Sequence, residues 1–340
     1  MEHNKPNRQQ GSGRGVSKFT MNLLKRFFVS NSTDKQEAEN GVEPTNCASE
    51  LQYFSVCGFM RSGTNWANNL LNLHPHIACH GEYHFDHLRP TFDQWINRNW
   101  SVAKAWGKQH QVAEHFELFI KQTMLECALA DPQTQNKSIR WLGDRSPRLL
   151  ESEAVSNAKH FRLIRDGRDV LVSWTYLSFA DNYLGTFDQH PAMLEKVEKF
   201  KHDPNYFLSR PKELLDDVKW VTQIARQWNS RVNKDDQYIS ETKSEETDAS
   251  VMSIRYEDLH RETEKIRKAM YNFLDLDADL ALSLDAGRHK TSAGFGEEDP
   301  QSLYRKGSVG DWKKYFSPTT KQIFEEFAGD ALSRHGYLDQ

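Results

Sequence analysis

The chain has 340 residues, of which 37% are hydrophobic, and it carries 44 Lys and Arg against 48 Asp and Glu. This composition predicts a globular protein, and the net charge of −4 gives no overall attraction to nucleic acid. No window approaches the roughly 18 consecutive apolar residues of a membrane-spanning helix. The four cysteines, Cys47, Cys57, Cys79 and Cys127, lack zinc-ligand spacing and are too few for a disulfide framework. We therefore expect a reducing, cytoplasmic location and no nucleic-acid partner.

Residues 1–50 are poor in apolar side chains, and we expect a disordered tail ahead of one domain at 51–340. A short segment at 17–29 interrupts this polar composition. Its apolar residues stand at helical spacing beside three cations, in the order Lys18, Phe19, Leu23, Leu24, Lys25, Arg26, Phe27 and Phe28. Such a helix could contact a membrane surface or a partner, or it could dock on its own domain. The apolar run is too short for a signal peptide.

From residue 51, short β-rich runs alternate with amphipathic helices. This pattern predicts an α/β fold, a single P-loop-like domain with a central parallel sheet flanked by helices. The expected strands are 53–57, 139–142, 161–164 and 251–254, and the expected helices are 112–127 and 214–232.

A last helix is predicted to begin at Ser317, an N-cap residue followed by Pro318, and to end at Gly336. Residues 180–212 show no clear period, so we expect an excursion above the sheet. The polar run 241–250 is expected to form a surface loop.

The first segment that carries chemistry is a strand, a turn and a helix. Gly58 and Gly63 let the backbone approach an anion, and the helix that follows directs free N–H groups at it. Ser62 and Thr64 add hydroxyl donors, and Arg61 adds charge. The glycine spacing matches the P-loop of nucleotide triphosphatases, but Thr64 stands where that motif needs Lys. A strand, turn and helix without any ligand is the alternative.

A second strand is predicted to end at Arg165, and a helix begins near Asp166. Arg165 and Ser173 could meet one anion, because Arg binds a phosphate through two parallel N–H groups. Arg168 is expected to form a solvated ion pair with Asp166 or Asp169.

In a third segment, Arg305 and Lys306 precede Gly307 and Gly310. The apolar residues of this segment show neither the period of a helix nor that of a strand. A flexible basic loop of this kind suits closure over a phosphate. Taken alone, such a loop is more often an exposed turn.

Together, the three segments resemble the sulfotransferases that use 3′-phosphoadenosine 5′-phosphosulfate (PAPS). The resemblance spans about 53–320 and is carried by Arg61-Ser-Gly-Thr-Asn-Trp, Ile164-Arg-Asp-Gly-Arg-Asp-Val-Leu-Val-Ser-Trp and Arg305-Lys-Gly-Ser-Val-Gly-Asp-Trp-Lys. It implies that the 5′-phosphosulfate is held by Arg61, Ser62, Gly63, Thr64 and Asn65, with Trp66 against the adenine. It further implies that the 3′-phosphate is held by Arg165, Ser173, Arg305, Lys306 and Gly307.

The catalytic base departs from the cytosolic members of that family. They carry a His in a Lys-Thr-His segment, where this chain has Gly143-Asp-Arg-Ser-Pro. Cys79-His-Gly-Glu-Tyr is similar to the segment that bears the glutamate base of tyrosylprotein sulfotransferases, which implies that Glu82 is the general base. Arg61 and Arg145 would then stabilise charge near the transferring group. His80 and His84 are the alternative bases, and an N-cap or surface role is the alternative for Glu82.

Five histidines, His74, His76, His80, His84 and His87, invite a metal interpretation. We expect polar loop residues instead, because Pro75 and Gly81 break a helix that would align them and no third ligand follows from the spacing. Sulfuryl transfer does not require Mg²⁺, so PAPS without a metal is the expected cofactor.

The acceptor is expected to carry a hydroxyl or amine group and to be a carbohydrate or a phenol. The faces of Phe85, Phe92, Trp95, Trp100 and Trp106 could stack on its ring, although core packing is the more common role. A P-loop small-molecule kinase and a nucleotide-binding protein without catalysis remain alternative functions.

Overall fold

A computed structural model describes residues 50–98, 101–150, 155–156, 158–180, 186–242, 250–286, 298–302 and 304–338. The predicted tail, its helix at 17–29, Trp100 and most of the polar run 241–250 lie outside these ranges. Within the described part, no helix has the length and apolarity needed to cross a membrane.

Five parallel strands form one sheet in the order β2-β3-β1-β4-β5. They are β1 (Gln52–Gly58), β2 (Ile77–Gly81), β3 (Trp141–Arg145), β4 (Lys159–Ile164) and β5 (Val251–Arg255). The central strand β1 has β3 on one side and β4 on the other, so the strand order reverses there. In open parallel sheets, ligands bind at the carboxyl ends of the strands beside such a reversal. The predicted α/β fold with a central parallel sheet is confirmed.

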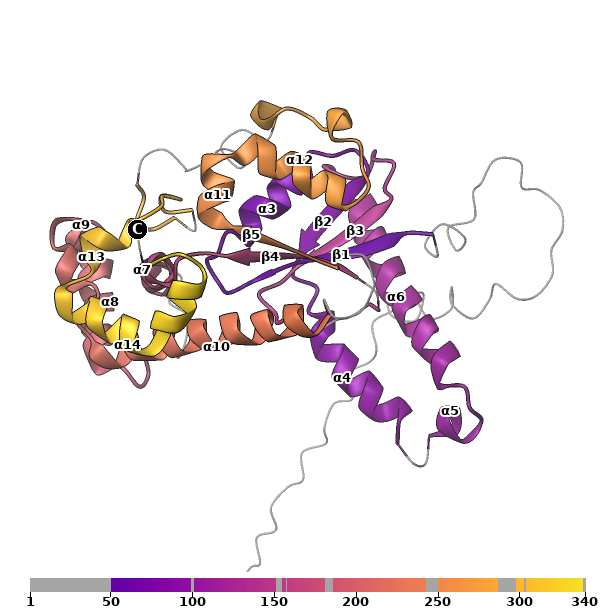
Figure 1. Ribbon diagram of the computed structural model, residues 1–340, viewed down its shortest axis with the longest axis horizontal. Helices are drawn as coiled ribbons and strands as arrows, with labels where there is room; N and C mark the ends of the chain where they lie inside the picture. The colour runs from indigo at the N-terminus through magenta and orange to yellow at the C-terminus, as the bar shows by residue number, and fades with distance from the viewer. Residues whose placement is uncertain are drawn as a thin grey trace, which may run out of the picture. The chain divides into compact units, whose positions relative to one another are not determined.

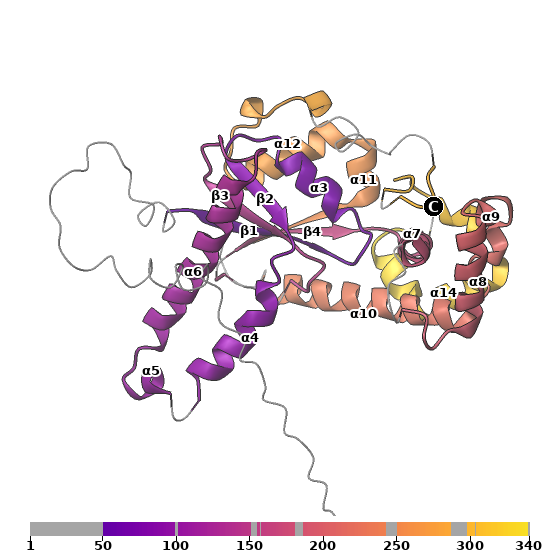
Figure 2. The ribbon, with the colours of Figure 1, turned by 180° about the vertical axis from the view of Figure 1, so that it is seen from behind.

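Helices cover both faces of the sheet (Figure 1; Figure 2). Phe54 and Val56 of β1 share a core with α3 (Thr64–Leu71) and α12 (Thr263–Phe273), whereas Tyr53 of β1, together with Leu51 just before the strand, shares a core with α6 (Gln109–Ala130). This alternation is the two-residue period of a strand buried on both faces. The remaining helices are α4 (Phe85–Ile96), α5 (Val102–Ala105), α7 (Gly167–Ala180), α8 (Pro191–His202), α9 (Tyr206–Ser209), α10 (Val218–Thr242), α11 (Tyr256–Arg261), α13 (Trp312–Tyr315) and α14 (Pro318–Arg334).

Most predicted elements are present, with shifts at their ends. The strand expected at 139–142 is β3, which reaches Arg145, and the helix expected at 214–232 begins at Val218 and continues to Thr242. The last helix is confirmed in detail, because the Ser317 side chain accepts a hydrogen bond from the Thr320 N–H.

The structure differs from the sequence analysis at two places. Residues 180–212 contain α8, where the buried Lys196 replaces an apolar residue on the inner face and hides the helical period. Strand β2 was not expected. Among the described residues it lies at the edge of the sheet, next to β3, and its five residues are too few to show a clear alternation.

Candidate nucleotide and sulfuryl-transfer site

The turn between β1 and α3 has a left-handed backbone at two residues, Arg61 (φ 69°) and Gly63 (φ 96°). A Cβ atom at Gly63 would lie 2.5 Å from Cδ2 of Tyr256. Position 63 therefore accepts only glycine without displacing the Tyr256 ring. The turn leads directly into α3, so the first N–H groups of that helix point toward the same space.

The loop after β1 is joined to β4 and α7 by hydrogen bonds. Arg61 Nε donates to Ser173 Oγ at 3.0 Å, and Arg165 Nη1 donates to the Arg61 carbonyl at 3.1 Å. Since β1 and β4 are adjacent strands, their carboxyl ends place Arg61 and Arg165 side by side. The first and second predicted anion-binding segments thus form one unit.

The third segment closes over this unit. Arg165 Nη2 donates to the Ser308 carbonyl at 2.8 Å, and the Tyr256 hydroxyl donates to the Gly307 carbonyl at 2.7 Å. The Arg165 guanidinium also lies 4.3 Å from the centre of the Tyr256 ring, a cation–π contact. Tyr256 therefore links all three segments.

The two cations of the third segment are held by two acids. Arg305 pairs with Glu298 and Asp311. Lys306 Nζ lies 3.0 Å from Asp311 Oδ1 and 3.4 Å from Glu298 Oε2. Although burial acts in the opposite direction, Arg305 and Lys306 lower the pKa of Asp311. The loop is held in place by these pairs.

A buried carboxylate fixes the end of this loop. Asp169 accepts hydrogen bonds from the N–H groups of Gly310 at 2.7 Å and Trp312 at 2.8 Å. Burial raises the pKa of Asp169 to about 6, although the charge of Arg165 opposes the shift.

Arg168 is not the solvated residue that the sequence suggested. Its side chain is 1% exposed, pairs with Asp166 at 2.8 Å and lies 3.8 Å from the centre of the Trp312 ring. The predicted partner is therefore confirmed and the predicted exposure is wrong.

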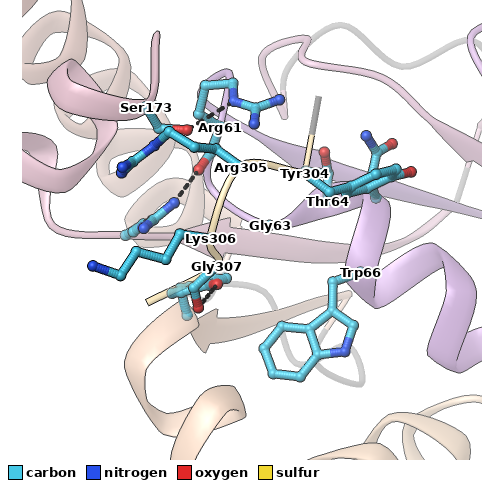
Figure 3. A pocket seen from close by; sticks show the side chains of 12 residues that line it. Arg61, Gly63, Thr64, Trp66, Ser173, Tyr304, Arg305, Lys306 and Gly307 are labelled. Atoms are coloured by element: carbon cyan, nitrogen blue, oxygen red, sulfur yellow. Dashed lines mark hydrogen bonds between the residues drawn. The ribbon is translucent and has the colours of Figure 1, made fainter. Parts of the chain in front are cut away.

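Residues from all three segments line one pocket (Figure 3). Its lining includes every residue predicted to bind the nucleotide except Ser62, which lies in the same turn, and it adds Tyr256 and Tyr304. The lining residues are Arg61, Gly63, Thr64, Asn65, Trp66, Arg165, Ser173, Tyr256, Tyr304, Arg305, Lys306 and Gly307. In Figure 3, Trp66 lies apart from Arg61 and Ser173, as an adenine-binding residue would lie apart from phosphate-binding ones.

Several buried polar atoms in or next to this pocket have no hydrogen-bond partner among the described residues. They are Ser62 Oγ, Arg165 Nε, Arg305 Nε and Ser308 Oγ. An unsatisfied buried polar group costs about 1–3 kcal/mol. Four such groups around one pocket fit a ligand with many acceptor oxygens, such as the phosphate and phosphosulfate groups of a nucleotide.

The proposed base lies at the same edge of the sheet, outside this pocket lining. Arg145 ends β3, and its partner in the register of β2 is Gly81, which precedes Glu82. Arg145 Nη1 donates to Glu82 Oε1 at 2.9 Å. Since β3 lies between β2 and β1, Glu82 stands two strands away from the loop that bears Arg61.

The histidines near Glu82 differ in their surroundings. His84 Nε2 lies 3.7 Å from Glu82 Oε2, whereas His80 Nδ1 lies 3.5 Å from Asp131 Oδ2. The sequence spacing gave no third residue to complete a metal site. In the structure, one nitrogen or oxygen atom each from His84, Asp86 and His87 lies within 4.8 Å of the others, so Asp86 could act as that third residue. This group is at the N-terminus of α4, whose positive end opposes the binding of a cation.

The aromatic residues after Glu82 do not share one role. Phe85 is buried in the core, and Phe92 stacks on Phe116 with ring centres 4.1 Å apart. Trp95 and Trp106 are 53% and 76% exposed, so core packing is the wrong interpretation for both.

The chain is similar to one protein-family model and to several solved structures. The family model described as the sulfotransferase domain matches residues 52–336. Among solved structures, a mouse sulfotransferase, SULT7A1, complexed with PAP is 15% identical, with 85% of this chain and 89% of that chain covered and a TM-score of 0.45. A retinol dehydratase in complex with androsterone and inactive cofactor PAP is 16% identical, with coverages of 86% and 82% and a TM-score of 0.40. A sulfotransferase domain from the Synechococcus PCC 7002 olefin synthase is 15% identical, with coverages of 82% and 95% and a TM-score of 0.39.

Proposed function

The chain belongs to the sulfotransferase domain family, and on this premise we propose that it transfers the sulfuryl group of PAPS in line to a hydroxyl acceptor, with Glu82 as general base. The observation that carries the proposal is the convergence of three separate basic segments on one pocket with unsatisfied buried donors.

The nucleotide-binding roles are assigned to the residues that line this pocket. Arg61, Ser62, Gly63, Thr64 and Asn65 would hold the 5′-phosphosulfate with the N-terminus of α3, and Trp66 would contact the adenine. Arg165, Ser173, Arg305, Lys306 and Gly307 would hold the 3′-phosphate. Guanidinium groups suit both tasks, because they offer parallel N–H donors to phosphate oxygens.

When bound, PAPS supplies the sulfuryl group and a phosphate leaving group. Glu82 accepts the proton of the attacking hydroxyl, which raises the nucleophilicity of its oxygen. Arg61 neutralises the negative charge that develops on the bridging oxygen, and α3 adds the positive end of its dipole. Arg145 keeps the Glu82 carboxylate oriented through their hydrogen bond. We assign it the further role of a second cation near the transferring group.

A thermal-shift comparison tests the nucleotide preference. Adenosine 3′,5′-bisphosphate (PAP) should raise the melting temperature of the protein, because a ligand that binds only the folded state stabilises it. ATP with Mg²⁺ should raise it less at equal concentration. A larger shift with ATP would favour a P-loop kinase. A shift with PAP but no sulfuryl transfer to any hydroxyl or amine acceptor would favour a binding protein without catalysis.

The acceptor class and the location are finer proposals. A carbohydrate or phenolic hydroxyl is tested by transfer of labelled sulfate from PAPS to representatives of both classes. The cytoplasmic location is supported by the free thiols of Cys57, Cys79 and Cys127 and is tested by cell fractionation.

A further inference from the structure

Helices α4, α5 and α6 form an arm (residues 85–130) that extends away from the sheet, with α5 at its far end in both views (Figure 1; Figure 2). Near the sheet the arm is packed. Phe92 stacks on Phe116, and Arg89 bridges Asp93 and Glu117 at 3.0 and 3.4 Å. These contacts hold α4 against α6 between the sheet and α5.

The far end, which we call the arm tip (residues 95–98 and 101–108), exposes large apolar side chains. Trp95 is 53% exposed, Val102 68% and Trp106 76%. Trp106 is the most exposed large hydrophobic residue in the described part of the chain. Exposed apolar groups gathered in one place indicate an interaction surface, whereas a single exposed one needs no explanation.

The charges of the arm tip all have one sign. Arg98, Lys104 and Lys108 are exposed, and the sequence contains no acidic residue between Asp93 and Glu114. This is unusual in a chain with more acids than bases. These cations stand within four residues of Trp95 or Trp106 in the sequence. A partner must therefore accept apolar rings and offer negative charge.

We propose that the arm tip binds the surface of an anionic lipid bilayer. Indole rings favour the interface between headgroups and acyl chains, because one edge is apolar and the N–H remains hydrated. Lys and Arg beside them gain electrostatic attraction from anionic headgroups. The arm tip has both features and lacks the acids that would repel such a surface. The described residues contain no helix that crosses a membrane, so the contact is peripheral.

Vesicle sedimentation with the full chain tests this proposal. Binding should be strong to vesicles that contain phosphatidylserine, weak to phosphatidylcholine alone, and reduced by salt, since surface attraction is screened. The variant K104Q/K108Q should bind at least about tenfold less, because two attractions to anionic headgroups are lost. W95A/W106A should also bind at least about tenfold less, because two large apolar side chains lose their burial in lipid. Both variants change exposed residues, and unchanged circular dichroism and melting temperature will show that they fold.

Matched controls separate the arm tip from other surfaces. L280A/L282A removes two similarly exposed apolar residues elsewhere, and K265Q/K268Q removes two exposed cations of α12. Both should bind vesicles like the wild type. F27E/F28E addresses the amphipathic segment at 17–29. If this variant loses all binding while W95A/W106A keeps it, the bilayer contact belongs to the N-terminal segment and the proposal is wrong.

Two further readouts complete the test. Brominated lipid should quench tryptophan fluorescence in the wild type and much less in W95F/W106F, and equal quenching in both would contradict insertion of these rings. Sedimentation velocity tests the alternative that the arm tip binds a second copy of this chain. Self-association that W95A/W106A abolishes, with no vesicle binding by the wild type, would assign the arm tip to a protein interface instead.

Discussion

Arg145 and Glu82 lie 63 residues apart in the sequence and share a hydrogen bond of 2.9 Å at the carboxyl edge of the sheet. The pair exists because β2 and β3 are parallel neighbours in which Gly81 stands opposite Arg145. A carboxylate that is oriented by a guanidinium and remains partly exposed can still reach a bound acceptor.

Replacement of Glu82 with Gln should slow sulfuryl transfer about 10²–10⁴-fold, because a positioned base is lost. Affinity for PAP should stay close to that of the wild type, since other residues line the nucleotide pocket. Steady-state rates and calorimetric titration will measure the two effects. H80N and H84N are the matched variants. Near wild-type turnover in E82Q together with inactivity in a folded H80N or H84N protein would transfer the role of base to that histidine.

Replacement of Arg165 with Ala should weaken PAP binding by about 1.5–3 kcal/mol, which is the range for hydrogen bonds to charged groups. The side chain also joins the Arg61 and Ser308 carbonyls, so the pocket loosens at the same time. R261A, which alters an exposed arginine on α11, is the control and should bind PAP normally. If R165A and R261A bind PAP with equal affinity, Arg165 does not contact the nucleotide.

Replacement of Gly63 with Ala should abolish nucleotide binding and lower the free energy of unfolding by at least about 1 kcal/mol. The left-handed backbone costs roughly this amount for any residue with a Cβ, and the new atom would also meet the Tyr256 ring. Gly329 is the opposite case, because a Cβ there meets nothing within 4 Å inside α14. G329A should therefore stabilise the protein by about 0.5–1 kcal/mol. Denaturant unfolding measures the free energy of unfolding of both variants. A G63A protein that binds PAP like the wild type would contradict the role given to Gly63.

The stability of the protein should depend on pH through Asp169. Burial raises the pKa of Asp169 from its ordinary 3.8 to about 6. The folded state therefore holds this proton more tightly than the unfolded state, and the associated stability is complete below pH 3.8 and is lost as the pH rises through about 6. D169N removes this titration. Between pH 4 and pH 7, the wild type should lose about 2 kcal/mol relative to D169N, as measured by urea unfolding. A difference that does not change with pH would indicate an ordinary pKa.

Sulfuryl transfer should survive treatment with EDTA, because the reacting group carries less charge than a phosphoryl group and cations of the chain surround the pocket. The assay compares rates before and after chelation. Activity that is lost with EDTA and returns with a divalent ion would overturn this expectation. The group formed by His84, Asp86 and His87 would then be the first place to mutate.

The local structure of the three segments proposed to bind the nucleotide could be predicted from the sequence, because each segment is local. A turn with Arg61 and Gly63 between a strand and a helix has a conformation that nearby residues decide. The same holds for the N-cap of α14 at Ser317, where the side chain and its partner stand three residues apart. Parallel strands alternating with helices predicted the fold class, since that pattern has few packing solutions.

The tertiary structure decided what depends on residues far apart in the chain. It paired β2 with β3 and so joined Arg145 to Glu82, and it placed Tyr256 against Gly63 and Gly307. Burial and exposure were decided at the same level. Arg168 is buried because Trp312 and the Tyr337 carbonyl surround it, whereas Trp106 is exposed at the end of the arm. Hydropathy describes what a side chain favours, but its surroundings are set by long-range packing, which a local pattern does not contain.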